Sequence, residues 1–595
     1  PNPIPYVEYL QDKGTIDRIL ASADLTFHII DGLTLKVSGG ADMSSALREV
    51  YEPKETNTGY NANGIAQQQN RRSSSYSNEN ILTYIKKIGV HSLNVMIGSS
   101  LLYEENKTSS MTARDFISDV YGYNNLDAGA QWDKPNTGRS KSTLLSGFGR
   151  INYVLMDKYL FTVTGRADGS SKFGTNNKWA FFPSFAAAWR INQEKFMKDV
   201  NWISNLKIRG SWGVTGNQNI SSYSSQEKMN TYVYPIGGVT SVGIGAGNMP
   251  NPDLKWETTA ITDIGVDFGV FNNRLNFTAD YYYKKTTDLL WNISVPLTTG
   301  FGSVLKNIGS LQNKGLELSV SADVLTGQFK WNTMINWSTN KNKVLEIPGY
   351  IPTQQGTISG HLKVNGSWLE PGLPVGVWNL LKTNGVMRTE KEWQDAARVA
   401  DSNFDKVGDM SFVDKDGDGK ISFGEDRQIV GDPNPDFIFG WTNNFSYKNF
   451  DLSIYINGSV GNDIYNVLRA ETNIVSAWGN QRAEVMNRWT ATNPNGKYPR
   501  AHVLVNQNLL QSDFLIEDGS FLRVQNVTLG YTFPKVSFLR SLRVYATAQN
   551  LLTITGYSGF NPEVNSQGQS NLQMGVDYNA YPTARSFILG VNIGF

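Results

Sequence analysis

The sequence predicts an all-β fold, namely a transmembrane antiparallel β-barrel. Three features lead to this prediction: an amphipathic strand at the end of the chain, a succession of hairpins with short turns, and a composition rich in aromatic residues and glycine. The 595 residues contain no linker, charge block or low-complexity tract that would divide them. Residues 1–595 are therefore expected to form one barrel domain.

The last nine residues, FILGVNIGF, alternate as an amphipathic strand does. One face carries only large apolar side chains: Phe587, Leu589, Val591, Ile593 and Phe595. A soluble protein has little to cover such a face at a chain end, whereas a barrel strand turns one face to lipid and the other to the lumen. The terminal Phe also resembles the signal that outer-membrane assembly machinery reads, so the bacterial cell outer membrane is the expected location.

The composition agrees with a membrane barrel. Aromatic residues make up 12% and charged residues 18%, with 56 glycines, which suits aromatic girdles and many tight turns. The chain has no cysteine and a net charge of +1, so there is neither a disulfide framework nor a basic footprint for nucleic acid. No run of about 18 apolar residues is present, and no membrane helix is expected.

Hairpins follow one another along the chain. Short turns are expected at residues 31–32, 87–89, 157–158, 271–273, 326–327 and 448–449. Long segments separate these hairpins, which gives the outer-membrane asymmetry of short periplasmic turns and long extracellular loops. A soluble β-sandwich or propeller is the alternative, but strands that often exceed about 10 residues and carry aromatics near each end favour the barrel.

About 17 strands are expected, the first near residues 18–30. Single-chain bacterial barrels carry even numbers of strands and close fully. An odd count therefore predicts further strands before Pro1, in a larger protein of which this chain is the later part. The absence of an initiating Met and of a signal-peptide h-region agrees with a processed or partial chain.

Eight segments, in order along nearly the whole chain, resemble the SusC/RagA family of TonB-dependent outer-membrane transporters. They are RADGSSKFG (166–174), FFPSFAAAWRINQEKF (181–196), LKIRGSWGVTGNQ (206–218), NPDLKWETT (251–259), NIGSLQNKGLEL (307–318), GDPNPDFIFGW (431–441), IEDGSFLRVQNVTLGYTFP (516–534) and AQNLLTITGYSGFNPEV (548–564). Each segment alone is a weak signal, but the ordered series is specific.

The resemblance implies a 22-stranded barrel filled by an amino-terminal plug. It also implies a SusD-like surface lipoprotein that acts as a lid, energy supplied through TonB, and a dimer of transporter–lipoprotein pairs. About five strands, the plug and the TonB box would then precede Pro1, because no segment of this chain resembles a plug or a TonB box. The substrate would be an oligomeric nutrient, either an oligosaccharide or a peptide.

The sharpest local motif is DKDGDGKISFGE, residues 414–425. Its spacing matches a calcium loop, with carboxylates at positions 1, 3 and 5, a Gly at 6, a backbone carbonyl at 7 and an acid at 12. The predicted ligands are Asp414, Asp416, Asp418, the carbonyl of Lys420 and Glu425, and the predicted cofactor is a structural Ca²⁺ in an extracellular loop. Asp426 follows at once, so either acid can be the last ligand. The alternative is a solvated acidic loop, rich in Asp and Gly because turns favour those residues.

Three long segments are expected on the outer side, at residues 214–255, 345–436 and 461–513. The second is expected to be the longest segment without strands, and the third to include short helices. Their aromatic residues suit an interface with the lipoprotein of more than about 2,000 Å²; they are Tyr223, Tyr232, Tyr234, Trp368, Trp378 and Trp478. The alternative is that these loops fold inward and close the barrel unaided.

The sequence gives no sign of an enzyme. The 4 histidines lack a metal-ligand spacing, and there is no cysteine nucleophile, P-loop or GxSxG elbow. The favoured function is import of glycans or peptides with a SusD-like partner. Two alternatives stay open: a SusC-like barrel that is a non-transporting scaffold in a larger outer-membrane assembly, and a siderophore or cobalamin receptor.

Overall fold

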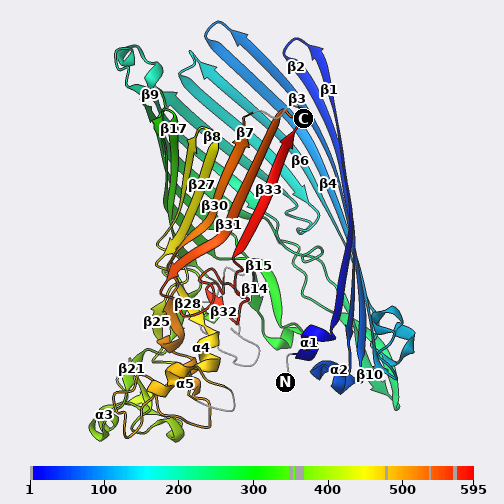
Figure 1. Cartoon of the computed structure of the whole chain (residues 1–595). Helices are drawn as coiled ribbons and strands as arrows, with labels where there is room; N and C mark the ends of the chain where they lie inside the picture. Colours follow the sequence, from blue (N-terminus) through cyan, green and yellow to red (C-terminus); the bar gives the residue numbers. More distant parts are fainter. Residues whose placement is uncertain are drawn as a thin grey trace. The chain divides into compact units, whose positions relative to one another are not determined.

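The computed structural model describes residues 4–347, 353–354, 367–475, 480–534, 538–566, 568 and 572–595. Antiparallel strands dominate this part of the chain, and 18 of them belong to one sheet (Figure 1). The chain divides into two compact units. The described helices are short: α1 (Ile4–Glu8), α2 (Asn57–Ala62), α3 (Glu390–Asp395), α4 (Val467–Thr472) and α5 (Gln507–Leu510). None of these described helices is long and apolar enough to cross a membrane.

The first unit contains Pro1–Ala188, Ser211–Ala260 and Thr287–Ile308. Its sheet strands are β1 (Gln11–Ile30), β2 (Leu33–Glu52), β3 (Ile65–Ile88), β4 (His91–Phe116), β5 (Gly129–Trp132), β6 (Asn136–Leu155), β7 (Tyr159–Ser170) and β8 (Trp179–Arg190). The long strands β1, β2, β3, β4, β6 and β7 pair antiparallel in this order. The short β5 pairs with the last residues of β4. Two separate hairpins also belong to this unit: β10 (Met229–Ile236) with β11 (Val239–Ala246), and β14 (Leu290–Ser294) with β15 (Ser303–Asn307).

The second unit contains Trp189–Gly210, Ile261–Thr286 and Gly309–Phe595. Its long strands are β16 (Ser310–Thr326), β17 (Phe329–Glu346), β26 (Phe437–Tyr447), β27 (Phe450–Val460), β30 (Phe521–Phe533), β31 (Ser541–Thr555) and β33 (Ser586–Gly594). They pair antiparallel in this order. Four strands contribute residues to both units: β8, β9 (Ile203–Asn217), β12 (Glu257–Val270) and β13 (Leu275–Thr287).

All six predicted short turns join consecutive strands of the sheet. The turn between β1 and β2 is Asp31–Gly32, with a φ of 78° at Gly32. Between β12 and β13, Asn272 and Asn273 have φ of 58° and 59°. Tight hairpin turns need positive φ, which Gly and Asn adopt at low cost, so the turn prediction is confirmed. The sheet has 18 strands because the four-residue β5 adds one to the 17 longer strands.

Alternation along the strands separates an apolar face from a polar one. In the first unit Leu82 of β3 lies opposite Ile97 of β4, and Leu101 lies opposite Leu145 of β6. Despite their size these side chains are 39–62% exposed. The opposite face of the same strands carries polar residues such as Ser75, Ser77, Asn94, Ser100 and Asn152. An exposed apolar face is stable in lipid, so it is the outer face of a membrane sheet and the polar face lines the lumen.

The strands differ in length in a way that matters for the membrane. β26 and β27 have 11 residues each, whereas β3 has 24 and β4 has 26. At about 3.4 Å per residue and a tilt of about 40°, the short strands just cross an apolar band of about 25 Å, and the long ones continue about 40 Å beyond it. The short turns are expected at the periplasmic end, and with that orientation this extra length of β3 and β4 projects on the extracellular side.

The segment 345–436 was expected to lack strands, and this prediction is wrong. It contains the short strands β18 (Thr353–Gln354), β19 (Ser367–Leu369), β20 (Val377–Leu380), β21 (Thr383–Val386), β22 (Arg398–Val399), β23 (Met410–Phe412), β24 (Lys420–Ile421) and β25 (Gln428–Gly431), together with helix α3. A strand of two to four residues is too short to show alternation in the sequence. In the segment 461–513 the expected short helices are present as α4 and α5.

The outer loops of the second unit fold around a shared hydrophobic core, the loop core. Its buried residues come from three separate loops: Trp378, Leu380, Leu381, Val399, Met410, Phe412 and Ile421 from the first, Tyr465, Val467, Ala470, Ile474, Leu509, Leu510 and Leu515 from the second, and Val576 from the third. Strands β28 (Asp463–Asn466), β29 (Ile516–Asp518) and β32 (Val576–Asp577) form a small sheet that links the second and third loops. The loops therefore form an ordered cap structure and not a set of independent excursions.

Candidate functional site

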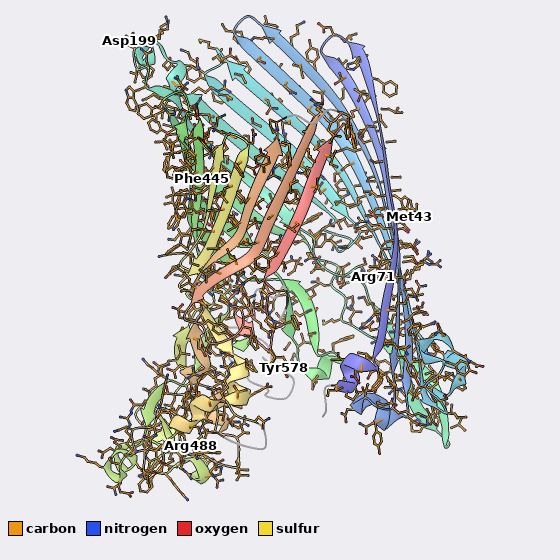
Figure 2. The ribbon with its side chains drawn as sticks, viewed as in Figure 1. Met43, Arg71, Asp199, Phe445, Arg488 and Tyr578 are labelled. Atoms are coloured by element: carbon orange, nitrogen blue, oxygen red, sulfur yellow. The ribbon has the colours of Figure 1, made fainter. Side chains whose placement is uncertain are left out.

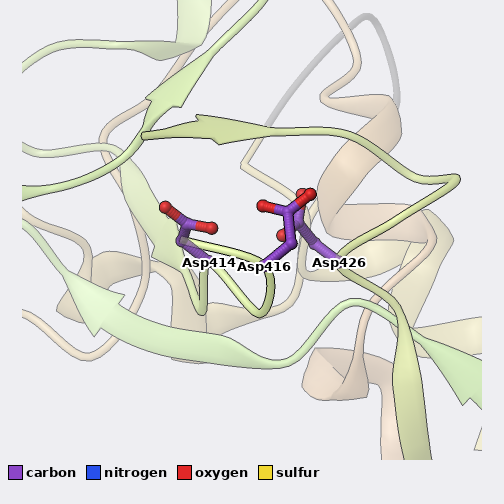
Figure 3. Close-up of side chains that lie close together, drawn as sticks. All are labelled: Asp414, Asp416 and Asp426. Carbon is purple, nitrogen blue, oxygen red and sulfur yellow. The ribbon is translucent and has the colours of Figure 1, made fainter. Parts of the chain in front are cut away.

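The acidic loop brings three carboxylates together. One oxygen each of Asp414, Asp416 and Asp426 lies within 4.8 Å of the others (Figure 3). In the described part of the chain this group includes neither Asp418 nor Glu425. Two of the predicted ligands, Asp414 and Asp416, are thus brought together, and the acid that lies beside them is Asp426, which is only 1% exposed, and not Glu425.

The first half of the loop is held by its own backbone. The Asp414 carboxylate accepts hydrogen bonds from the backbone N–H groups of Gly417 (2.7 Å) and Gly419 (2.8 Å). Both glycines have a φ near 80°, which a residue with a side chain adopts only with strain. Asp418 accepts from the N–H of Lys420 at 2.7 Å, so its carboxylate is turned to the backbone.

The second half of the loop is tied down by Asp426. Its two oxygens accept hydrogen bonds from the N–H of Lys415 (2.9 Å) and the N–H of Ser422 (2.7 Å). The Asp426 N–H bonds to the Ser422 carbonyl at 3.1 Å, and this five-residue turn directs Asp426 inward. Glu425 is exposed, and its carboxylate accepts a hydrogen bond from the Ser422 hydroxyl at 3.3 Å. Lys420 lies in β24, which pairs with β22 and anchors this side of the loop.

The negative charges of the loop carboxylates repel one another. The backbone N–H of Gly419 lowers the pKa of Asp414, with Gly417 helping in the same direction. The backbone hydrogen bond from Asp418 lowers the pKa of Asp416, but partial burial and the charges of Asp418 and Asp426 outweigh it and raise the pKa overall. A divalent cation among Asp414, Asp416 and Asp426 would relieve this crowding, and carboxylate oxygens are the ligands that a hard cation prefers.

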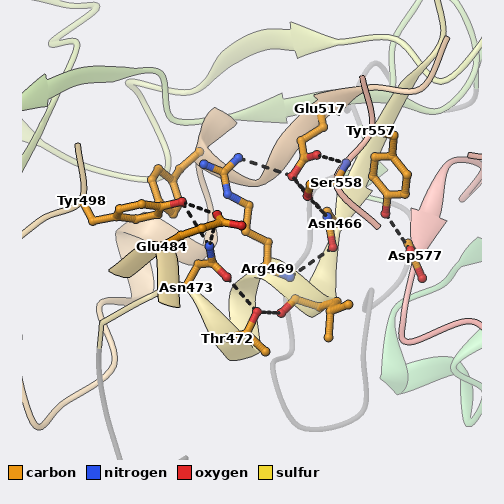
Figure 4. Close-up of polar contacts among 12 residues, drawn as sticks. Asn466, Arg469, Thr472, Asn473, Glu484, Tyr498, Glu517, Tyr557, Ser558 and Asp577 are labelled. Atoms are coloured by element: carbon orange, nitrogen blue, oxygen red, sulfur yellow. Dashed lines mark hydrogen bonds and ion pairs between the residues drawn. The ribbon is translucent and has the colours of Figure 1, made fainter. Parts of the chain in front are cut away.

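A polar network ties the outer loops of the second unit together (Figure 4). Asn466 caps helix α4 through the N–H of Arg469, and Arg469 forms an ion pair with Glu517 at 3.5 Å. Glu517 also accepts hydrogen bonds from the N–H and hydroxyl of Ser558, both at 2.9 Å. These bonds join the loop at 461–513 to the loop that follows β31, so both loops keep a fixed geometry.

An open cavity of about 810 Å³ lies in the second unit. Its polar lining comes from the lumen face of several strands and from the base of the outer loops, and includes Asp280, Glu317, Asn336, Tyr455, Asn457 and Asn565. The Asn457 side-chain oxygen is buried and has no hydrogen-bond partner among the described residues. Residues from so many strands are not adjacent in the sequence, so no sequence signal identified this cavity.

The hairpin of β10 and β11 is exposed and uncharged. No charged residue occurs from Met229 to Ala246. Val233, Val242 and Ile244 are 60%, 64% and 75% exposed and lie on one face. On the other face the rings of Tyr232 and Tyr234 lie over Gly245 and Gly243. An isolated two-stranded hairpin is marginally stable in water, and an exposed apolar face of this kind is typical of an interaction site.

Comparison with known proteins identifies the family. The family model "TonB dependent receptor-like, beta-barrel" matches residues 2–422. The chain belongs to this family. TonB-dependent receptor P3 of Formosa agariphila is 36% identical over 100% of this chain and 60% of its own length. TonB-dependent receptor SusC of Bacteroides thetaiotaomicron is 31% identical over 100% of this chain and 57% of its own length.

The solved structure of the RagAB peptide transporter matches this TonB-dependent receptor barrel with a TM-score of 0.84 and 25% identity, over 99% of this chain and 63% of that chain. The resemblance to the SusC/RagA branch is thus confirmed, and so are the antiparallel barrel fold and the outer-membrane location. The family consists of transporters and receptors and not of enzymes. The chain spans 57–60% of the length of these two curated relatives.

Proposed function

We propose that this chain is the greater part of the barrel of a SusC-like TonB-dependent importer of oligomeric nutrients, glycans or peptides. The observation that carries the proposal is the likeness over the whole chain to SusC, at 31% identity, and to a peptide transporter, at a TM-score of 0.84. The cavity supports an oligomeric substrate, since at about 810 Å³ it exceeds a single sugar or amino acid in size. Its amide, hydroxyl and carboxylate groups suit the polar backbone of a glycan or a peptide.

Energy coupling belongs to the complete protein. Since the chain spans 57–60% of the length of the relatives P3 and SusC, a plug, a TonB box and the remaining strands of a 22-stranded barrel are proposed to lie in the rest of that protein. TonB would act on that segment. The polar lumen face of the described strands is suited to contact with such a plug.

A SusD-like lipoprotein is the proposed lid. The exposed face of the β10–β11 hairpin supports a protein partner, because Val233 and Ile244 would lose water on contact. Of the aromatic residues expected at this interface, Trp368 and Trp378 are 6% and 0% exposed, so they pack inside the loops and leave no ring for a partner. Tyr232 and Tyr234 remain exposed, while Trp478 lies outside the described residues. The proposed interface with the lipoprotein buries more than about 2,000 Å² of surface.

A structural Ca²⁺ is proposed for the acidic loop. Asp414, Asp416 and Asp426 would supply carboxylate oxygens, and the Lys420 carbonyl would be a further ligand. The ion would stiffen the loop that leads from β23 to β25 and thereby the cap structure. The loop does not take part in the ladder of the sheet, so its metal would not be needed for the barrel itself.

Import is tested in cells that express the complete protein and its neighbouring lipoprotein. Uptake of labelled oligosaccharide and oligopeptide pools should require the proton-motive force and the TonB box. Uptake that persists in a TonB-box deletion would contradict active import. Correct assembly with no uptake of any pool would favour the scaffold instead, and growth on a ferric siderophore or cobalamin alone would favour the third function.

A further inference from the structure

The outer face of the first unit carries a cluster of positive side chains, the basic cluster, formed by Arg72, Lys107, Arg139 and Lys141. These residues lie on three neighbouring strands, β3, β4 and β6. Arg72 lies directly opposite Lys107, and Lys107 lies directly opposite Arg139. No register shift interrupts these two pairings. Like charges at directly opposed positions have Cβ atoms about 4.5–5.5 Å apart and destabilise the sheet unless an anion compensates them.

Alternation places the basic cluster on the lipid side of the sheet. The positions of Arg72 and Leu82 on β3 differ by an even number, and so do those of Lys107 and Ile97 on β4. Successive side chains of a strand point to opposite faces, so Arg72 and Lys107 share the face of these apolar residues. Arg71, labelled in Figure 2, is on the opposite, lumen face. The basic cluster therefore faces away from any substrate path.

The height of the basic cluster follows from an aromatic pair. The rings of Tyr76 and Tyr103 lie 6.3 Å apart on the same outer face, where barrels carry their extracellular girdle. At about 3.4 Å per residue and a tilt of about 40°, β4 rises about 31 Å along the membrane normal from His91 to Tyr103, close to the hydrocarbon thickness. Lys107 lies about 10 Å above Tyr103, at the level of the lipid headgroups.

The protein itself neutralises only part of this charge. Glu105 accepts a hydrogen bond from Arg139 at 2.6 Å and lies 3.6 Å from the Lys107 ammonium. Within the described part of the chain Arg72 makes no ion pair. Asp17 of β1 lies on the same face, two strands from Arg72. Four cations against Glu105 and this more distant carboxylate leave a surplus of positive charge, and the Lys107 and Arg139 side chains are 54% and 58% exposed. Arginine and lysine at such spacing are suited to phosphate oxygens.

We infer that the basic cluster binds the phosphate groups of a phosphorylated glycolipid of the outer leaflet. The acyl chains would lie on the apolar face below the Tyr76–Tyr103 pair, and the sugar-linked phosphates would contact Arg72, Lys107 and Arg139. A lipid satisfies both observations at once, the position at headgroup height and the continuity with the apolar face. A soluble acidic protein would satisfy only the charge. The site lies outside the lumen and does not depend on import.

The test uses the complete protein, purified in mild detergent, and native mass spectrometry with two probes: phosphorylated lipid A and the same lipid without its phosphates. The variant Arg72→Ser with Lys107→Ser removes two cations from the outer face. The control Arg71→Ser with Arg150→Ser removes two cations from the lumen face of β3 and β6. Resistance of the folded barrel to SDS at room temperature confirms that both variants fold.

Wild type and control should bind phosphorylated lipid A alike, and the outer-face variant should bind it about thirtyfold more weakly. The lipid without phosphates should bind wild type as weakly as phosphorylated lipid binds the variant. Equal binding of both lipids, or no loss in the folded variant, would overturn the inference. The inference would also be overturned if inorganic phosphate saturated the basic cluster at concentrations at which the lipid does not bind. It would equally be overturned if the outer-face variant lost an acidic partner protein while its binding of the lipid was unchanged.

Discussion

Replacement of Asp426 by Ala separates the two possible last ligands of the acidic loop. In the wild type the buried Asp426 carboxylate accepts two backbone hydrogen bonds, from Lys415 and Ser422. Removing it leaves two donors without partners at about 1–3 kcal/mol each. Because both donors are only part-buried, we take about 3 kcal/mol in total, which raises the open population of the loop about 150-fold.

Glu425→Ala is the matched control. Glu425 is the neighbouring acid, it is exposed, and its carboxylate accepts a hydrogen bond from the Ser422 hydroxyl at 3.3 Å. Its loss should cost less than about 0.5 kcal/mol, so the open population should change about twofold at most. The two variants remove the same charge from adjacent positions and differ only in where the carboxylate lies.

Trypsin provides the assay, because Lys415 and Lys420 lie within the loop. Cleavage is followed by mass spectrometry with Ca²⁺ or with chelator, and Ca²⁺ affinity is measured by calorimetry. Asp426→Ala should be cleaved rapidly in both conditions and bind Ca²⁺ about 100-fold more weakly. Glu425→Ala should match wild type in both. Faster cleavage and weaker binding in Glu425→Ala than in Asp426→Ala would refute the assignment of Asp426.

Three further predictions concern the outer loops. Trp378→Ala empties a fully buried site in the loop core and should destabilise the cap by about 3–5 kcal/mol, seen as rapid loop proteolysis while the barrel keeps its SDS resistance. The double variant Val233→Asp with Ile244→Asp should abolish co-purification of the lipoprotein, whereas Ser241→Asp on the other hairpin face should preserve it. Equal recovery of the lipoprotein with the wild type, the double variant and Ser241→Asp would exclude the hairpin as a contact. The hydrogen bond from Tyr498 lowers the pKa of the Glu484 carboxyl from its ordinary value of 4.5. The stability that this carboxylate contributes is therefore complete above pH 4.5 and is lost as the pH falls through its lower pKa in the folded protein. Loop proteolysis should rise over that pH range in wild type and be insensitive to the same pH change in Glu484→Gln.

The barrel strands and turns were predictable because their signals are local. A period of two over ten or more residues shows in a short window, and turns such as Asp31–Gly32 carry the residue types that positive φ requires. The loop core was not predictable for the opposite reason. Trp378, Tyr465 and Val576 meet in one core although about 90 to 110 residues separate each from the next, and the short strands that carry them show no period.

The acidic loop falls between these two cases. Its spacing identified Asp414 and Asp416, because the turn at Gly417 and Gly419 is encoded within six residues. The same spacing put Glu425 at position 12 and left Asp426 open as the alternative, and in the structure Asp426 is the acid that lies beside Asp414 and Asp416. The deciding interaction is the hydrogen bond from the Asp426 N–H to the Ser422 carbonyl, which depends on how the chain turns after β24. A motif fixes which residue types are present, whereas a local turn fixes which of two adjacent acids points inward.

Burial divides the apolar residues of the outer loops into two roles. Trp378 is fully enclosed in the loop core, and its burial contributes to the stability of the cap before any partner arrives. Val233 and Ile244 of the hairpin are largely exposed, so their burial is still available to a binding partner. A lid that binds a preformed cap loses little further loop entropy, because the ordering was completed on folding. Binding energy should therefore concentrate at the hairpin, and substitutions in the loop core should change stability much more than they change affinity for the lid.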